Sequence, residues 1–594
     1  MWGMTDIPAS APAPDSPHPS HRLDDSDAPW PQRPWIMAAI CAVAGLIFHM
    51  LVDRGDAASE PGRSALAAFV AIATVVFVLG AELRRWHWAL GFALLWGAAM
   101  GLIAWSSAGY NLHSSMIEWP FWSGLLAVLV ATPLFQTRRD VAPDGRFWKL
   151  WQMPYARLHS HAWTDAVIGA AGLVFTGITF LLVFLIGQMF SLIGIDLIER
   201  LFRDDWFPWM LAGAAFGGAV GLLRERDRLV STLQRLVMIV LAVLAPVLAA
   251  ALVIFLLSLL GTGLTKLWDS GFSTAALMMA VAAFAVLLAN AVIGNGTDDR
   301  ANNSLLRVAA AVLVVAVLPL AVIAYYSMHL RVIQYGWTPE RIWGVVAAMI
   351  ALAYGVAGLW SVAKGRRGFD DVLRPLQQKL AIGLTLLALF LALPIVDFGA
   401  ISTRDQVARL KSGAVASEKF DWAALAFDFG PDGRAALKDL AKSVDKTRAG
   451  LAEWALKAKD RWELNGSGSA VDESDMVYGA KPIEQKIRIF PVGRSLPAEA
   501  YAALAAQGQC KTAPCIAYVL GDSRIAVVSR GGNVGLLVRD AKTQQWSENY
   551  DAFRSGDTTR GLTIDELEKV VVEVRPVTRQ QVFVDGKPVG EDFE

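Results

Sequence analysis

Residues 236–260 read LVMIVLAVLAPVLAAALVIFLLSLL, and no charged side chain interrupts the run. A helix needs about 20 apolar residues to cross the hydrocarbon core of a bilayer. The backbone of such a helix satisfies its own hydrogen bonds, as it must where no water is present. The stretch therefore predicts a transmembrane helix.

Similar runs lie on both sides of it, and none has Asp, Glu, Lys or Arg in its core. The eleven runs are 35–52, 64–81, 88–108, 119–136, 166–190, 206–223, 236–260, 274–294, 308–327, 342–362 and 380–396. The chain is 55% hydrophobic and only 18% charged, which is unusual for a water-soluble protein of 594 residues. We therefore expect a mostly α fold, a polytopic transmembrane helix bundle of about eleven spans over residues 35–396.

The two ends of the chain differ in composition from this bundle. Residues 1–34 are rich in Pro, Ser and Asp, so we expect a disordered N-terminal tail. Residues 397–594 hold 56 of the 108 Lys, Arg, Asp and Glu side chains. This third of the chain is therefore soluble in character.

The C-terminal region divides into a helical stalk, a linker and a small domain. Apolar residues recur at helical spacing from Pro431 to Leu464, which predicts one amphipathic helix or a broken pair within a helical stalk over 397–464. A Gly-Ser run makes 465–475 a flexible linker. We expect a soluble α+β domain over 476–594. Its predicted elements are strands at 486–490, 515–520, 524–529, 533–539 and 570–574, a helix at 497–507, a helix capped by Thr563 with Glu566, and a hairpin turn at Asp585-Gly586.

Basic residues are unevenly distributed between the connections of the bundle. With the N-terminus in the cytoplasm, the connections on the cytoplasmic side contain 20 Lys and Arg residues, and those outside contain 7. Cytoplasmic loops retain Lys and Arg, so this orientation is favoured. An odd number of spans then places the C-terminal domain on the opposite face, which in a bacterium is the periplasm.

Two cysteines lie close together in the C-terminal domain. Cys510 and Cys515 face an oxidising compartment in this orientation and can form a disulfide, which contributes about 2 kcal/mol in the chain-entropy model. Two reduced thiols at a turn are the alternative. The third cysteine, Cys41, lies in the first span.

The inventory of residues excludes several chemistries. All eight histidines lie at or before His329, so residues 397–594 cannot form a Ser-His-Asp, Cys-His or His-containing zinc site of their own. The 54 basic and 54 acidic residues balance, so no strong field attracts nucleic acid. We predict no catalytic residues, no metal site and no cofactor.

A polar segment before the fifth span contains His159, His161 and Asp165. These residues can present ligands to a metal if a helix begins at His161. Tyr155 and Trp163 favour a different interpretation, in which the segment anchors the helix at the membrane interface.

A second polar cluster, predicted on the outside, supplies the candidate ligand-binding site. It comprises His329, Arg331, Tyr335, Glu340 and Arg341. Its Arg and aromatic side chains can hold a lipid head group or a glycan at the membrane surface, although such residues are also typical interface anchors. A purely structural role accounts for Thr338 as the cap of a helix that opens at Pro339, with Glu340 in its first turn.

Gly213, Gly217 and Gly221 recur at every fourth position of the sixth span. Small residues at this spacing let two helices approach closely. The second helix can belong to the same bundle, or to another copy of the chain in a homodimer.

Four short stretches carry a family resemblance. They are Tyr335-Gly336-Trp337-Thr338-Pro339-Glu340-Arg341, His161-Ala162-Trp163, Ile193-Gly194-Ile195 and Pro394-Ile395-Val396-Asp397. With them the chain resembles the bacterial membrane-protein family classed as domain of unknown function 4153, over roughly residues 30–410. Trp337 departs from the leucine expected at its position. The resemblance implies a polytopic protein of the bacterial inner membrane, and it supplies no activity or catalytic residue.

Three functions are compatible with this sequence. The first is a non-enzymatic envelope protein, seated in the lipid bilayer, that displays a periplasmic domain for binding or sensing an envelope ligand or protein partner. The second is a transporter of a lipid or another amphipathic solute, with Arg331 to Arg341 as an outside gate. The third is a membrane-interface transferase with His329, Arg331 and Glu340 as its polar centre. The first ranks highest because no catalytic set is present, and the spans lack the central charge that ion-coupled carriers use.

Overall fold

The protein is described from a computed structural model. The described residues are 29–52, 60–108, 115–141, 153–203, 205–264, 273–459, 461–465, 483–506, 510, 515–528, 534–540, 545–548, 580–584 and 587–593. Outside them lie most of the predicted N-terminal tail, the linker beyond Asn465, the Thr563–Glu566 cap, the 570–574 strand and the Asp585-Gly586 turn.

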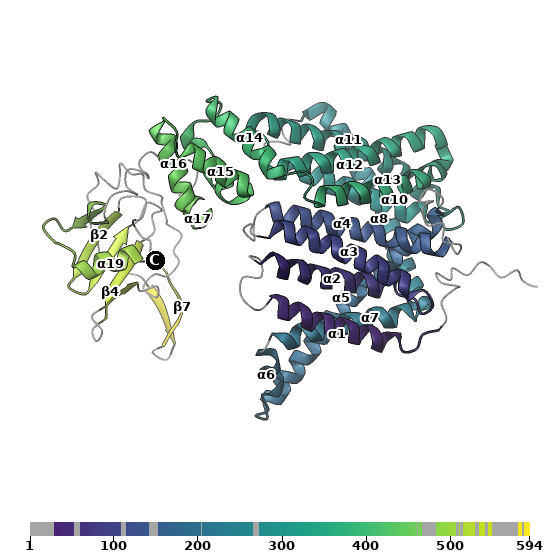
Figure 1. The fold of residues 1–594 in the computed structure, drawn as a ribbon, viewed down its shortest axis with the longest axis horizontal. Helices are drawn as coiled ribbons and strands as arrows, with labels where there is room; N and C mark the ends of the chain where they lie inside the picture. Colours follow the sequence, from purple (N-terminus) through teal and green to yellow (C-terminus); the bar gives the residue numbers. More distant parts are fainter. Residues whose placement is uncertain are drawn as a thin grey trace, which may run out of the picture. The chain divides into compact units, whose positions relative to one another are not determined.

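Eleven long helices among the described residues correspond one to one to the eleven predicted runs (Figure 1). They are α1 (Arg33–Val52), α2 (Pro61–Gly80), α3 (Trp86–Ser107), α4 (Ser115–Val141), α5 (Tyr155–Ser191), α7 (Trp206–Arg224), α8 (Asp227–Thr262), α10 (Thr274–Ile293), α11 (Ser304–Tyr335), α12 (Pro339–Gly365) and α13 (Phe369–Ala392). By length and composition, the described residues contain ten segments able to cross a membrane, and the last of them, Pro339–Ala392, includes both α12 and α13. The predicted multi-pass helical fold is confirmed.

Helix α5 begins earlier than predicted. The apolar run predicts a span from residue 166, whereas the helix starts at Tyr155 and has 37 residues. At about 1.5 Å per residue it is roughly 55 Å long, well beyond the hydrocarbon core. His159 and His161 are only 7% and 6% exposed. They are therefore buried among helices. The anchoring of this segment at the membrane interface by Tyr155 and Trp163 stays a prediction.

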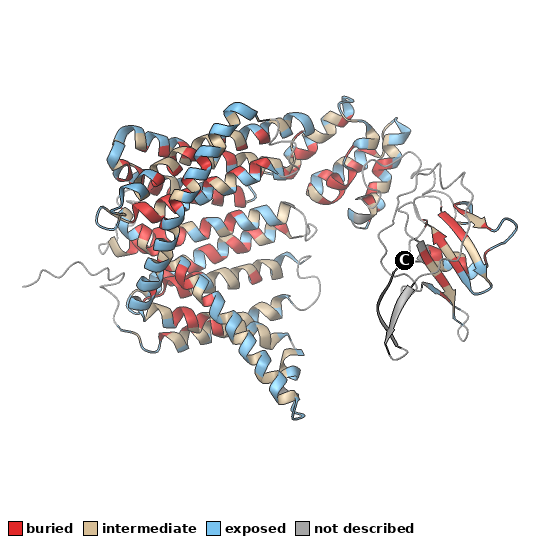
Figure 2. Cartoon of the chain, turned by 180° about the vertical axis from the view of Figure 1, so that it is seen from behind, coloured by how far each residue is buried: buried red, intermediate tan, exposed pale blue. Residues whose placement is uncertain are grey.

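The helices pack around several apolar clusters rather than one. The largest cluster lies between α10, α11 and α12, with α8 and α13 against them. A second joins α1, α2 and α7 to the beginning of α5, and a third joins α3 and α4 to α13. The later part of α5 and helix α6 (Leu197–Arg203) together span residues 173–203. None of the described residues in this range is buried (Figure 2). This part of α5 is therefore available to lipid.

The glycine face of α7 packs against α1. A methyl group at Gly213 would meet the Cys41 carbonyl oxygen, and one at Gly217 would meet the Cys41 sulfur at 2.7 Å. At Gly221 it would lie 2.7 Å from the Pro34 Cα. Since α1 covers this face, a homodimer through the three glycines would have to displace α1.

A short helical segment follows the membrane helices. It contains α14 (Phe398–Lys411), α15 (Gly430–Leu440) and α16 (Lys446–Lys457), and the Asp397 carboxylate caps α14 by accepting a 2.8 Å hydrogen bond from the Ala400 amide. The chain divides into two compact units, and the first comprises Met1–Ser412 with Ala423–Leu456. Most of the segment predicted as a stalk is therefore in the same unit as the membrane helices.

The second unit comprises Gly413–Trp422 with Lys457–Glu594 and contains a five-stranded sheet. The strands are β1 (Ile487–Phe490), β2 (Cys515–Gly521), β3 (Arg524–Val528), β4 (Val534–Arg539) and β5 (Trp546–Glu548), in that order, and a two-stranded sheet contains β6 (Gln580–Val584) and β7 (Lys587–Phe593). β1 pairs in parallel with β2 after a crossover through α19 (Ala498–Ala506), and the other pairs are antiparallel. The predicted α+β character is confirmed.

Cys510 and Cys515 are paired in this unit. Their Cα atoms are 5.5 Å apart, and the two side chains form a disulfide. Both residues belong to the apolar core, together with Leu504 and Leu537. The disulfide therefore connects the approach to β2 with its first residue.

We expect Gly217→Ala to destabilise the contact between α1 and α7. The added methyl group has no room against Cys41, and overpacking of this kind costs about 1–3 kcal/mol. The measurement is the unfolding midpoint of the purified protein in detergent. Gly177→Ala is the matched control, because a methyl group there meets nothing within 4 Å. Equal midpoints for the two variants would contradict this packing.

Candidate functional site

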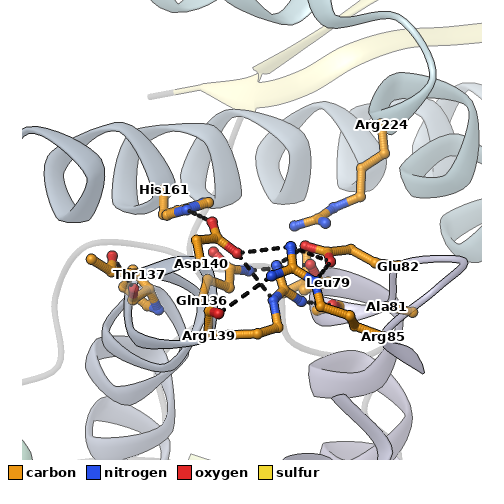
Figure 3. Close-up of polar contacts among 12 residues, drawn as sticks. Leu79, Ala81, Glu82, Arg85, Gln136, Thr137, Arg139, Asp140, His161 and Arg224 are labelled. Carbon is orange, nitrogen blue, oxygen red and sulfur yellow. Dashed lines mark hydrogen bonds and ion pairs between the residues drawn. The ribbon is translucent and has the colours of Figure 1, made fainter. Parts of the chain in front are cut away.

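Charged side chains are gathered inside the bundle where α2 and α4 end (Figure 3). Arg139 forms an ion pair with Glu82, and the two side chains are only 2% and 1% exposed. Arg85 bridges Glu82 at 2.8 Å and Asp140 at 3.2 Å. The His161 Nε2 atom lies 2.9 Å from Asp140 Oδ2, which connects α4 to α5. We call these five residues the Glu82 network.

Side chains of α4 also bind the end of α2. The Gln136 amide donates to the Leu79 carbonyl oxygen at 3.2 Å, and Arg139 donates to the Gly80 carbonyl oxygen at 2.6 Å. The last carbonyl groups of a helix have no partner within the helix itself. The network therefore satisfies backbone groups as well as charges.

Further ion pairs extend this end of the bundle to α1, α7 and α13. Arg33 lies 3.4 Å from Glu225 and donates to the Ala81 carbonyl oxygen. Arg224 lies 3.1 Å from Asp165. Arg374 donates to the Ile293 carbonyl oxygen at 2.7 Å and to Asp370 at 2.8 Å. We call this the arginine-rich end. Its charges are mutually compensated, which indicates a structural role.

The two histidines of the polar segment lie on different faces of α5. Two residues are about 200° apart around a helix. His161 contacts Asp140, whereas His159 lines a cavity of about 570 Å³ between α4, α5 and α10–α13. We call it the His159 cavity. The two side chains are therefore not placed to bind one metal ion, and the described residues contain no group of three or more potential metal ligands.

A second cavity lies where α11 ends and α12 begins. It has a volume of about 510 Å³ and is lined by Thr274, Ser327, Leu330, Arg331, Gln334, Tyr335 and Arg341. We call it the Arg331 cavity. Arg341 donates to the Tyr335 and Gly336 carbonyl oxygens at 3.0 and 2.7 Å, so it stabilises the end of α11. The Arg331 side chain is exposed, and it forms no hydrogen bond or ion pair with the other described residues.

Helix α14 holds the loop beside this cavity. The Asp405 carboxylate accepts a 2.7 Å hydrogen bond from the Trp337 amide. Gln406 donates to the Tyr335 and Trp337 carbonyl oxygens at 2.9 and 3.0 Å. Arg409 donates to the Gln334 carbonyl oxygen at 2.7 Å. The wall of the cavity is thus connected directly to the first helix after the last membrane span.

Three of the five residues predicted to bind a ligand line the Arg331 cavity: Arg331, Tyr335 and Arg341. The other two do not line it. His329 is exposed and stacks on Tyr325, with ring centroids 6.3 Å apart, and Glu340 is exposed in the first turn of α12. The polar centre predicted for a transferase, which needs His329 and Glu340 beside Arg331, is therefore not a feature of this cavity.

The predicted cap of α12 differs in one respect. The helix begins at Pro339, as predicted, but the Thr338 side chain makes no capping hydrogen bond. Only its backbone carbonyl accepts, at 3.0 Å from the Ile342 amide.

Sequence reasoning missed most of the His159 cavity. Its polar lining includes Asn290, Tyr354, Gln377 and Gln378, which come from three different helices. Asn290 interrupts an apolar run and was a detectable signal. Gln377 and Gln378 precede the run that begins at 380, so they read as part of a connection.

We expect Arg139→Met to destabilise the protein by about 3 kcal/mol, because it leaves a buried carboxylate without its main partner. The double variant Glu82→Leu/Arg139→Met should be less destabilised, since no uncompensated charge remains. The control is Arg203→Met, whose partner Glu199 is 65% exposed and whose loss should cost about 0.5 kcal/mol or less. Unfolding midpoints in detergent measure all three. The same unfolding midpoint for Arg139→Met and Arg203→Met would show that the Glu82 network does not stabilise the fold.

A family model matches residues 35–440, a region that ends at Leu440, the last residue of α15. The family is described as a domain of unknown function (DUF4153). No curated protein and no solved structure matches the chain. Because the matched region covers more than half of the chain, the protein belongs to the DUF4153 family.

Proposed function

We propose that this multi-pass membrane protein is a non-enzymatic envelope protein that binds an anionic group in the Arg331 cavity and displays its C-terminal α+β unit on the same side of the membrane. The observation that carries the proposal is the Arg331 side chain, which lines a cavity of about 510 Å³ between polar neighbours. Its guanidinium group suits a phosphate or a carboxylate, which it can bind through two parallel hydrogen bonds.

The neighbouring side chains support an anionic ligand. Ser327 and Gln334 add hydrogen-bonding groups, and Arg341 adds a second positive charge. Arg341 is already engaged with two carbonyl oxygens, so it contributes mainly through its field. A lipid head group at the membrane surface and a soluble anion share this chemistry.

The contacts of α14 support a sensing role. A ligand beside Gln334 and Tyr335 touches the same residues whose carbonyl oxygens accept hydrogen bonds from Arg409 and Gln406. Any shift of this loop must therefore be met by α14 or break these bonds. The chain continues from α14 toward the C-terminal unit, which supplies a route from ligand to displayed domain.

Transport of a lipid or another amphipathic solute is the second candidate, and one observation favours it. Helices α10, α11 and α12 line both the Arg331 cavity and the His159 cavity. A solute passing along these helices would meet a positively charged region and then an apolar one. Flux of labelled lipid across proteoliposomes distinguishes transport from sensing, because sensing requires binding alone.

We expect Arg331→Ala to weaken binding of a short-chain phosphatidylglycerol by roughly tenfold, the loss of one charge-assisted hydrogen-bonding group. Thermal stabilisation of the purified protein by the lipid measures the affinity. Short-chain phosphatidylcholine tests the need for net charge, and inorganic phosphate and glucuronate separate a lipid head group from a soluble anion. Arg200→Ala, which removes an exposed arginine elsewhere, should bind like the wild type. Unchanged affinity in Arg331→Ala would overturn the proposal.

The proposed location of the C-terminal unit predicts the state of its cysteines. In the Cys41→Ala background, Cys510 and Cys515 should resist alkylation in intact cells and react only after reduction, because the periplasm is oxidising. A reporter fused after Glu594 gives the compartment independently. Ready alkylation of both thiols without reductant, together with a cytoplasmic reporter signal, would place the unit on the other side.

A further inference from the structure

The His159 cavity combines an apolar body with a small polar region. Its volume is about 570 Å³, within the range of pockets that bind small molecules. Among the described residues that line it, none is Asp, Glu, Lys or Arg. Apolar side chains such as Met279, Val286 and Ile350 form most of the wall. The site is therefore suited to a molecule that is largely apolar and carries no formal charge.

Both ring nitrogens of His159 are buried and have no hydrogen-bond partner among the described residues. The residue as a whole is only 7% exposed. A neutral imidazole has one N–H donor and one acceptor nitrogen, and buried groups of this kind are rarely left unpaired. The Asn290 Oδ1 atom is a second buried acceptor without a partner in the described chain, and it lines the same cavity.

The surrounding side chains fix the position of His159. Tyr155, His159 and Trp163 are four residues apart and form one aromatic face of α5, with the His159 ring 5.7 Å from Tyr155 and 6.3 Å from Trp163. The Tyr155 hydroxyl donates to Gln377 Oε1 at 3.0 Å, which also orients a second polar group of the wall. The polar region is therefore organised before any ligand binds.

The cavity reaches the lipid-facing surface of the bundle. Leu126 belongs to its wall and is 41% exposed. Ala162 and Ala347, on two other helices of the wall, are also exposed. A membrane-dissolved molecule can therefore approach sideways from the bilayer and does not have to cross the water phase.

We propose that the His159 cavity binds an uncharged amphiphile drawn from the bilayer, whose hydroxyl, amide or carbonyl group forms hydrogen bonds with His159 and Asn290. The apolar part of the molecule lies against the aliphatic wall. A charged head group is excluded, because the wall offers no counter-charge and burying an unpaired charge is strongly unfavourable. Among the described residues, none lines both this cavity and the Arg331 cavity, so the proposal goes beyond the function proposed above and can be tested with different variants.

The test is photo-crosslinking of the full chain in lipid nanodiscs. Three probes carry the same alkyl chain and diazirine: a monoacylglycerol, a fatty acid that is anionic, and a plain hydrocarbon. We expect the monoacylglycerol to label peptides containing 155–163 and 283–290 and the other two probes to label them weakly. His159→Phe keeps the aromatic packing but removes both hydrogen-bonding groups, and it should reduce this labelling roughly five- to tenfold. His159→Gln retains a donor and an acceptor and should restore it.

Stability measurements separate a lost site from a lost fold. Without probe, His159→Phe should unfold at the same temperature as the wild type or higher, because it removes buried unpaired polar atoms. With monoacylglycerol, the wild type and His159→Gln should gain stability and His159→Phe should not. Leu173→Ala, on the lipid-facing part of α5, is the control and should behave as the wild type. Equal labelling by the hydrocarbon probe, preference for the fatty acid, or full labelling of His159→Phe would each overturn the proposal.

Discussion

The buried ion pair between Arg139 and Glu82 determines how the first helices of the bundle meet. Charges this deeply buried are tolerated only when they are paired and hydrogen-bonded, so α2 and α4 have little freedom to slide past each other. Asp140, the next residue of α4, then fixes α5 through His161. Since His159 is about 200° away on the same helix, this contact directs the opposite face of α5 into the bundle. The position of His159 in its cavity therefore depends on a network to which it contributes no contact.

The location of the membrane helices could be predicted from sequence because the signal is local. Each apolar run contains its own evidence, and each corresponds to one helix of the structure. The start of α5 could not be predicted in this way, because residues 155–165 are polar and resemble a connection. Their partners are distant in the chain: Asp140 is 21 residues before His161, and Arg224 is 59 residues after Asp165. A charged residue at the edge of an apolar run can thus lie on the surface or be buried. Which of the two holds depends on whether a residue distant in the chain pairs with it.

In the candidate ligand site, too, the features that depend on neighbouring residues could be predicted, and those that depend on distant residues could not. Sequence alone brought together Arg331, Tyr335 and Arg341, which are close in the chain and line one cavity. It also predicted a helix opening at Pro339. The expected cap by Thr338 is absent, because the loop is held instead by Asp405, which lies 68 residues from Trp337. A local motif predicted where the helix begins, whereas a distant helix supplies the hydrogen bonds that hold the loop before it.

The tight contact between α11 and α12 bears on how the two cavities can communicate. A methyl group at Gly355 would lie 2.6 Å from the Leu318 Cα, and one at Gly358 would lie 2.5 Å from Val314 Cγ1. Backbones this close leave no room for one helix to slide independently, because packed interiors transmit displacement rather than absorb it. A ligand that shifts α11 at Arg331 must therefore move α12, and α12 contributes Tyr354 to the other cavity. Linkage between two binding sites is reciprocal. The factor by which an anion at Arg331 changes the affinity of the His159 cavity for its ligand therefore equals the factor by which that ligand changes the affinity for the anion.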